Sequence, residues 1–272
     1  MERLKKSMKT YLRIAAAIAV SVAVAVPGSS ARQVTQAAAE RYSNYCEEDS
    51  LDVAGIPVDE IQELAHPTDE QRAALDELGN ASVQAAQIVK AACPTDVSPT
   101  AIGRIDAVQQ RVQAMLKAVQ MEQPALAKFY NMMSDEQKAR LDTLTQKPPP
   151  ANEGDAVARG RPPMAGCRNR ALPDWPTARI LRDVHPTAMQ RTLLNALQDA
   201  AAKARGMLDA SCSIAMPVTP PARLSAIEQR LQTVLAAIGT LRSALNEFYG
   251  SLSDKQKAQF NMIGRPRASK QG

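Results

Sequence analysis

Apolar side chains recur every three or four residues along most of the chain, and this spacing predicts amphipathic helices rather than strands. Aromatic residues make up only 3% of the sequence, and runs of β-branched residues are few, which also favours helix over sheet. The two clearest apolar stripes share one pattern and lie in different halves of the chain. They consist of Ile105, Val108, Val112, Met115, Leu116, Val119, Leu126, Phe129 and Met133, and of Leu224, Ile227, Leu231, Val234, Leu235, Ile238, Leu245, Phe248 and Leu252.

The likeness of the two stripes is part of an internal repeat. Residues 66–144 correspond without a gap to residues 185–263, at an offset of 119. Cys46 and Cys167 also correspond, at an offset of 121. The sequence therefore predicts one helical unit that occurs twice in tandem. The aligned pairs include His66-Pro67-Thr68 with His185-Pro186-Thr187, Cys93 with Cys212, Phe129-Tyr130 with Phe248-Tyr249, and Ser134-Asp135 with Ser253-Asp254.

Each copy is expected to contain two long helices with short helices beside them. Ser98 and Pro99 are typical of a helix start, with serine as the N-cap and proline at the first helical position. Pro124 lies inside the second long helix and should kink it, whereas Ser243 holds that place in the second copy. The predicted helices run from near Thr68 to Cys93 and from Pro99 to about Met132, with short ones at Asp135–Leu144, at Asp254–Ile263 and, more weakly, near Val58–Leu64.

These elements predict an all-α fold made of two tandem helical-hairpin units, each with two long antiparallel helices plus short flanking helices. A segment rich in Pro and Gly separates the two copies and reads as an extended spacer. The predicted organisation is a signal peptide at 1–31, a first repeat at 40–147, a linker at 148–164, a second repeat at 165–264 and a basic tail at 265–272.

The first 31 residues have the three-part layout of a secretory signal peptide. A positive start is followed by the apolar stretch Ile14–Val26 and by small residues that end at Ala31. An uncleaved membrane anchor is the alternative, but spanning a bilayer takes about 20 apolar residues. We therefore expect a chain that is exported to the periplasm and cleaved after Ala31.

The net charge of +5 depends largely on this leader, which carries +4, so it is poor evidence for nucleic-acid binding. The rest of the chain divides sharply, with −7 over residues 32–147 and +8 over residues 148–272. Attraction between the two halves is one interpretation. A basic second half that faces anionic lipid or an acidic client is another, and a difference without a role is the third.

Four helix starts carry the same short element, a Ser or Thr followed three residues later by Gln. This spacing is that of a capping box, in which the hydroxyl accepts from a backbone N–H and the Gln side chain accepts from the N–H of the cap. Each cap contributes about 1 kcal/mol. A helix-starting role is the main interpretation, and a direct role in binding is the alternative. The pairs are Thr68 and Gln71, Ser134 and Gln137, Thr187 and Gln190, and Ser253 and Gln256.

With two such boxes in each copy behind a signal peptide, the chain resembles the LTxxQ-motif proteins, which are the Spy/CpxP-like periplasmic proteins. The resemblance covers about His66–Leu144 and His185–Ile263, and it leaves out the segments around Cys46 and Cys167. Only Leu252 keeps the leading Leu of the motif, and Ser replaces Thr in both closing boxes.

The resemblance implies a helical periplasmic protein that acts as an ATP-independent chaperone or modulates envelope-stress signalling. The partners it implies are unfolded or partly folded envelope proteins. Chaperones of this family work as dimers with a concave surface, and a tandem chain can place its two copies as an intramolecular pseudo-dimer. The opposite charges of the two halves favour such a pairing.

The four cysteines, two in each copy, predict disulfides in an oxidising compartment. The repeat favours the pairs Cys46–Cys93 and Cys167–Cys212, and pairing between the copies is the main competitor. A disulfide that closes a loop of this length is worth roughly 4 kcal/mol in the chain-entropy model. No Cys-x-x-Cys occurs in the sequence, which argues against a thiol-redox enzyme.

The sequence offers little support for catalysis or for a metal site. His66 and His185 each precede Pro just outside a helix start, where a structural or exposed role is the usual one. Neither copy has a second His or a Cys pair at zinc spacing, and most of the eleven Met fall on core positions or helix ends. Because no catalytic or phosphate-binding motif is present, we expect neither enzymatic activity nor a cofactor.

The leading hypothesis is thus a non-enzymatic chaperone-like binder or an envelope-stress modulator in the periplasm. A metal-responsive or regulatory protein that partners a membrane sensor is the first alternative, and a structural envelope component is the second. Peripheral contact of the basic second half with an anionic membrane is compatible with each hypothesis.

Overall fold

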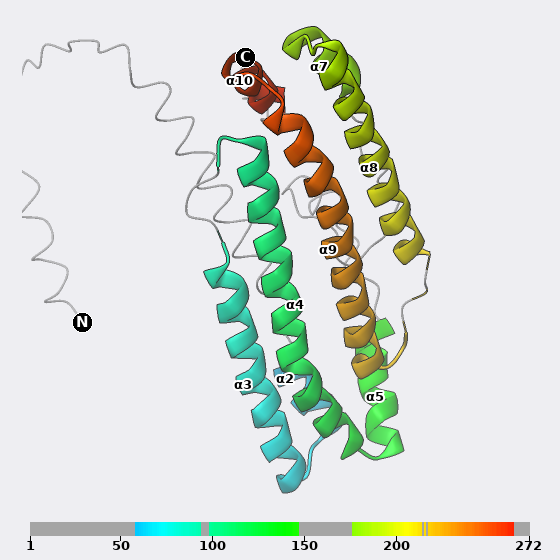
Figure 1. The fold of residues 1–272 in the computed structure, drawn as a ribbon. Helices are drawn as coiled ribbons and strands as arrows, with labels where there is room; N and C mark the ends of the chain where they lie inside the picture. The colour runs from blue at the N-terminus through cyan, green and yellow to red at the C-terminus, as the bar shows by residue number, and fades with distance from the viewer. Residues whose placement is uncertain (1–57, 94–97, 147–175, 214, 216, 264–272) are drawn as a thin grey trace, which may run out of the picture. The chain divides into compact units, whose positions relative to one another are not determined.

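The computed structural model describes residues 58–93, 98–146, 176–213, 215 and 217–263 (Figure 1). The predicted signal peptide, linker and basic tail lie outside these residues, as do Cys46 and Cys167. The secondary structure of the described residues is entirely helical, in agreement with the predicted fold class. Its helices are α2 (Val58–Ala65), α3 (Asp69–Ala91), α4 (Ala101–Asn131), α5 (Asp135–Gln146), α7 (Thr177–Val184), α8 (Ala188–Cys212), α9 (Pro220–Gly250) and α10 (Asp254–Ile263).

The start of α4 differs from the prediction. Thr100, not Ser98, is the N-cap, and its hydroxyl accepts a hydrogen bond from the backbone N–H of Gly103 at 3.0 Å. Ser98 lies just before the helix, where its hydroxyl accepts from the N–H of Thr100 at 3.4 Å. Ser98 and Thr100 are two residues apart, and the helix begins after Thr100 because the hydroxyl of this residue reaches the N3 amide.

Helix α4 continues through Pro124, whose side chain is exposed. The missing N–H and the ring of proline disturb an α-helix most where neighbouring atoms cannot move aside. On the exposed side of α4, water can hydrate the carbonyl that this proline leaves without its usual donor. The matching residue of α9 is Ser243. Both helices span 31 residues, which shows that the proline does not shorten α4.

Each repeat is a hairpin of two long helices that pack along their length. Helix α3 packs on α4 in the first repeat, and α8 packs on α9 in the second. The short helices pair as well, α2 with α5 and α7 with α10, so they bring together the segment before each hairpin and the segment after it. This pairing explains why the elements that flank the hairpins contribute buried residues such as Ile61, Leu141, Ile180 and Phe260.

The two hairpins meet through α4 and α9, which run antiparallel (Figure 1). Asp106, near the start of α4, forms an ion pair with Arg242, near the end of α9, at 2.7 Å. Towards the other end, Gln120 and Gln123 donate to the two carboxylate oxygens of Glu228 at 2.9 and 2.8 Å. Each of these contacts joins one repeat to the other.

Both apolar clusters take side chains from both repeats. The first contains most buried residues of the first repeat together with Leu224 and Leu231 of α9. The second contains eight buried residues of the second repeat, and Ile102 and Ile105 of α4 pack against it. The first part of α9 therefore completes the cluster of the first repeat, and the first part of α4 completes the cluster of the second. Because apolar burial is the main source of folding free energy, the repeats stabilise each other.

One residue of the predicted stripes is exposed, whereas the others are buried or half-buried. Val108 on α4 is 45% exposed, although it belongs to the apolar face. The contacts of Glu77 with Lys128, and of Gln71 with Met132, set the alignment of the two antiparallel helices. At this alignment α3, which ends at Ala91, stops before the level of Val108. The prediction was wrong here because periodicity shows the face of a helix but not the length of its neighbour.

Within the described ranges, no helix is long and apolar enough to cross a membrane.

Candidate functional site

The four Ser/Thr–Gln elements lie at the starts of α3, α5, α8 and α10. In each element the hydroxyl accepts from the N–H of the Gln three residues later, at 3.3–3.4 Å. The Gln Oε1 in turn accepts from the N–H of the Ser or Thr at 2.8–3.0 Å. All four are therefore complete capping boxes, which satisfy backbone N–H groups that a helix start leaves without a partner.

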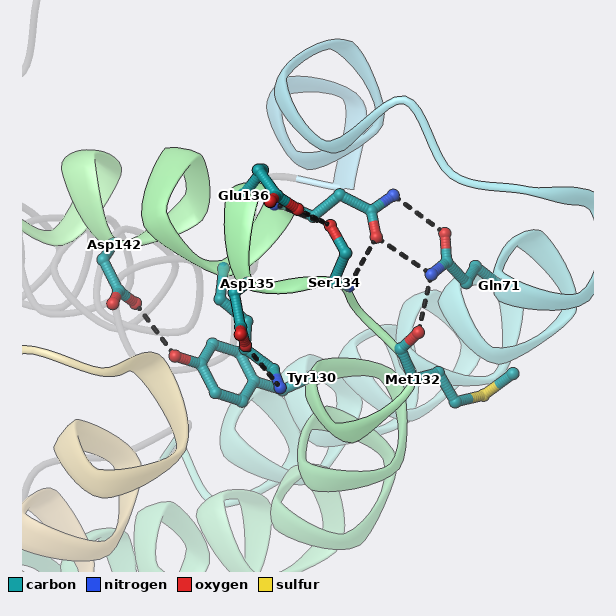
Figure 2. Close-up of polar contacts among 9 residues, drawn as sticks. Gln71, Tyr130, Met132, Ser134, Asp135, Glu136 and Asp142 are labelled. Carbon is teal, nitrogen blue, oxygen red and sulfur yellow. Dashed lines mark hydrogen bonds and ion pairs between the residues drawn. The ribbon is translucent and has the colours of Figure 1, made fainter.

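The two boxes of the first repeat are joined to each other (Figure 2). Gln71 Nε2 donates to Gln137 Oε1 at 3.0 Å, and Gln137 Nε2 donates to Gln71 Oε1 at 2.9 Å. The remaining N–H of Gln71 donates to the carbonyl of Met132 at 2.7 Å, and that of Gln137 donates to the carbonyl of Ala65 at 2.8 Å. The pair thus connects the end of α2, the start of α3, the end of α4 and the start of α5.

The second repeat contains the same arrangement. Gln190 and Gln256 exchange amide hydrogen bonds at 3.1 and 2.9 Å. Gln190 also donates to the carbonyl of Ser251 at 2.7 Å, and Gln256 donates to the carbonyl of Val184 at 3.3 Å. Both networks follow from the repeat, since each participating position is offset by 119.

The Gln amides are fully used in these networks. A Gln side chain has two N–H donors and an oxygen with two lone pairs. Gln71 and Gln137 each donate twice and accept twice, and each is only 7% exposed. An amide in this state has no free group to offer a ligand. The motif therefore holds the ends of the hairpin together, which agrees with the helix-starting interpretation and extends it to tertiary structure.

Further polar contacts stabilise the junction between α4 and α5 (Figure 2). The Ser134 hydroxyl donates to Glu136 at 2.8 Å, and this bond, followed by the backbone N–H of Glu136, lowers the pKa of that carboxyl group. The Tyr130 hydroxyl donates to Asp142 at 3.3 Å. Burial, and then the charge of Asp142, raise the pKa of Tyr130. These shifts follow from a structural junction of two helices, so they do not by themselves indicate catalysis.

His66 and His185 occupy a special backbone position. Their φ angles are 47° and 49°, in the left-handed region that non-glycine residues rarely adopt. Each follows the last residue of a short helix, where a left-handed residue ends the helix and turns the chain towards the buried Pro67 or Pro186. Both imidazoles are exposed, as expected of a structural position at the surface.

Beside the second of these turns lies a surface cavity of about 290 Å³, lined by Leu181, His185, Pro186 and Arg191. The guanidinium of Arg191 donates to the carbonyl of Pro186 at 3.2 Å, so this side chain braces the turn. Across the described ranges, no three His, Cys, Asp or Glu side chains lie together in a way that could hold a metal ion.

Two of the four cysteines belong to the described residues. Cys93 lies just beyond α3, and its sulfur is 3.7 Å from the carbonyl oxygen of Val89. Cys212 is the last residue of α8 and is disulfide-bonded. Because Cys46 and Cys167 lie outside the described residues, the pairs Cys46–Cys93 and Cys167–Cys212 stay predictions.

Sequence reasoning missed one unusual residue, Glu122 on α4. Its side chain is 0% exposed, and neither carboxyl oxygen has a hydrogen-bond partner among the described residues. The signal was present in the repeat, because Glu122 aligns with Leu241 and falls on the apolar face between Val119 and Leu126. A charged residue in an apolar stripe, opposite a leucine in the other copy, is the pattern that would have identified it.

The model of one protein family, described as the LTXXQ motif family protein, matches residues 54–145 and 173–264. The chain belongs to the LTXXQ motif family. The two matches correspond to the two repeats and include both Gln networks. The family is helical, non-enzymatic and typically periplasmic. No curated protein and no solved structure matches the chain.

Proposed function

We propose that this LTXXQ protein is an exported, ATP-independent chaperone-like binder of unfolded envelope proteins, and that its two repeats act together as an intramolecular pseudo-dimer. The observation that carries the proposal is the antiparallel packing of α4 on α9, which joins two copies of the family unit through apolar clusters that both repeats complete. A chain of this kind needs no second copy to present the helices of two units.

The surface of the described residues supports weak and adaptable binding. Large apolar side chains are exposed in both repeats, including Val83 on α3 at 60% and Met189 on α8 at 78%. They are distributed over several helices, including α3, α4, α7, α8 and α10. Scattered apolar contacts within a polar surface suit partners of many sequences, since no single contact is essential.

A client-aggregation assay tests the proposal. The chain without residues 1–31 should suppress light scattering of a reduced, unfolding client at equimolar protein and without ATP. Replacing four exposed apolar residues by serine should weaken this suppression, because client chains bind chiefly by burying apolar surface. These residues are Val83, Val108, Met189 and Val218.

A matched control replaces four exposed polar residues of the long helices by serine, namely Gln84, Gln87, Gln113 and Asn195. This control should suppress aggregation as well as the parent chain does. Absence of suppression by a folded parent chain would refute chaperone activity. Equal loss in the two variants would show that the exposed apolar residues do not bind clients.

Native mass spectrometry tests the pseudo-dimer part separately. We expect the full mature chain to be monomeric at the concentration at which it suppresses aggregation, because α4 and α9 already provide the contact between two units. A stable dimer as the sole species would contradict this part of the proposal and would leave the chaperone activity to be judged on the assay above.

A further inference from the structure

Glu122 is a carboxyl group enclosed in the apolar interior of the first repeat. It lies on the face of α4 that carries the buried residues Ala118, Val119 and Leu126 within one turn on either side. Its side chain is 0% exposed, and both carboxyl oxygens lack a hydrogen-bond partner among the described residues. An ionised carboxylate is disfavoured in such surroundings, because the hydration that it loses is compensated only in part.

The facing helix offers one polar group. Ser82 on α3 is 8% exposed and lies between the fully buried Leu78 and Ala85, one turn away on either side. Burial raises the pKa of Glu122 to about 7, and the polar side chain of Ser82 offsets only part of this rise. This value places the change of charge near neutral pH, far from the range of an exposed glutamate.

No charged group on the elements packed against α4 contributes to this shift, whose causes are burial and Ser82 alone. Two of the carboxylates on α3 and α9 form other contacts. Glu77 forms an ion pair with Lys128 at the surface, and Glu228 accepts hydrogen bonds from Gln120 and Gln123. The charged residues of the two long helices packed against α4 are Asp69, Glu70, Arg72, Asp76, Glu77 and Lys90 on α3, and Arg223, Glu228, Arg230, Arg242 and Glu247 on α9.

The second repeat shows what the same hairpin looks like without this carboxyl group. At the offset of 119, Leu241 takes the place of Glu122 and Ala201 takes the place of Ser82. Leu241 packs against the second apolar cluster. An apolar pair therefore satisfies the geometry of the hairpin, and the Glu122–Ser82 pair is not needed to build it.

We propose that Glu122 is a pH-sensitive switch that loosens the packing of α3 on α4 when it ionises and tightens it when it is protonated. The neutral acid is tolerated in the core, whereas the carboxylate draws water or moves out towards it. Because the second repeat has Leu241 instead, only the first hairpin responds, and the two repeats differ in how their stability changes as the pH rises from acidic to neutral values.

The direction of the effect follows from linkage. The pKa of Glu122 is higher in the folded chain, at about 7, than in the unfolded chain, where it has its ordinary value near 4.5. Between these two values the folded state binds more protons, so the stability of the first hairpin falls as the pH rises. The contribution is fully present below the unfolded value, is lost as the pH rises through about 7, and changes little above it.

Hydrogen exchange on the full mature chain tests the switch. After correction for intrinsic exchange rates, protection of the α3 amides and the facing amides of α4 should fall by up to about tenfold per pH unit as the pH rises towards 7. Protection of α8 and α9 should change less. In Glu122→Gln and Glu122→Leu, this additional pH dependence should disappear, because neither side chain titrates.

Two further measurements keep the test decisive if a variant folds poorly. Carbon NMR of the parent chain should show one glutamate carboxyl that titrates near neutral pH and is missing in Glu122→Gln. The double change Ala201→Ser and Leu241→Glu should transfer the pH dependence to α8 and α9. Titration of Glu122 in the ordinary acidic range, or an unchanged pH dependence in a folded Glu122→Gln chain, would overturn the proposal.

Discussion

The glutamines of the LTXXQ motif show how one side chain can serve two levels of structure. Each accepts a hydrogen bond from its own helix cap, and each also bonds the amide of the matching glutamine and a carbonyl at the end of another helix. Buried amides are costly unless every polar group finds a partner. The mutual pairing of Gln71 and Gln137 meets this condition, which explains why glutamine is the residue that the position requires.

Replacing Gln137 by alanine should therefore destabilise the chain by about 2–4 kcal/mol. Gln71 would lose two of its four hydrogen bonds, and the carbonyl of Ala65 and the N–H of Ser134 would lose the bonds that they make with Gln137. Urea denaturation followed by circular dichroism measures this loss. Gln84→Ala on the exposed face of α3 is the control and should change the free energy of unfolding by less than about 0.5 kcal/mol. Equal losses in the two variants would show that the Gln pair contributes no specific stability.

The backbone of the two histidines supports a second prediction at this scale. A non-glycine residue in the left-handed region costs about 1 kcal/mol or more, and His66 has a φ of 47°. His66→Gly should leave the free energy of unfolding unchanged or raise it by up to about 1 kcal/mol, since glycine relieves this strain but gains entropy in the unfolded chain. His66→Val should lower it, because a β-branched residue tolerates this conformation poorly. Thermal unfolding of the parent and the two variants measures these changes. A His66→Val chain as stable as the parent would show that the backbone at this position is not strained.

At the scale of elements, α4 and α9 are equivalent helices of the two repeats, so the effect of proline in one can be compared with its absence in the other. Pro124 lies on the exposed face inside α4, and Ser243 has the same place in α9. Pro124→Ser restores a backbone donor without touching the core, so it should raise the free energy of unfolding by roughly 1–3 kcal/mol. The reverse change, Ser243→Pro, should lower it by a similar amount. A pair of thermal unfolding curves tests both, and a destabilised Pro124→Ser chain would mean that α4 is adapted to its proline.

Features that depend on residues close together in the sequence could be predicted, and features that depend on residues far apart could not. The helix spans and the four capping boxes were predictable because they depend on residues within one turn of each other, as in Thr68 and Gln71. The pairing of Gln71 with Gln137 was not predictable, because it joins residues 66 positions apart. The exposure of Val108 depends on where α3 ends, and the burial of Glu122 depends on which residues face α4. The apolar pattern of α4 alone gives no information on its neighbours.

For the whole molecule, the shared apolar clusters are the main consequence of the duplication. Leu231 belongs to α9 of the second repeat but is buried, at 2% exposed, in the cluster of the first. Leu231→Ala should cost about 2–4 kcal/mol and should reduce hydrogen-exchange protection in α3 and α4. Leu197→Ala, in the second cluster alone, is the control and should affect α8 first. If Leu231→Ala left α3 and α4 unaffected, the repeats would not share a core.

The ion pair between the repeats contributes less to their association than apolar burial does. The contact between Asp106 and Arg242 is partly exposed, and pairs of this kind contribute at most about 1 kcal/mol. This ion pair therefore contributes little to the strength of the contact between the repeats. Apolar burial between α4 and α9 accounts for that strength, with Leu224 and Leu231 on one side and Ile102 and Ile105 on the other.

The two repeats form one packed body through α4 and α9. Cutting the chain between them tests this packing most directly. A protease site placed in the segment 148–164 would be cleaved under reducing conditions, and native mass spectrometry would then weigh the products. The two fragments should stay together as a one-to-one complex with the mass of the uncut chain. Fragments that separate, or that pair only with copies of themselves, would contradict it.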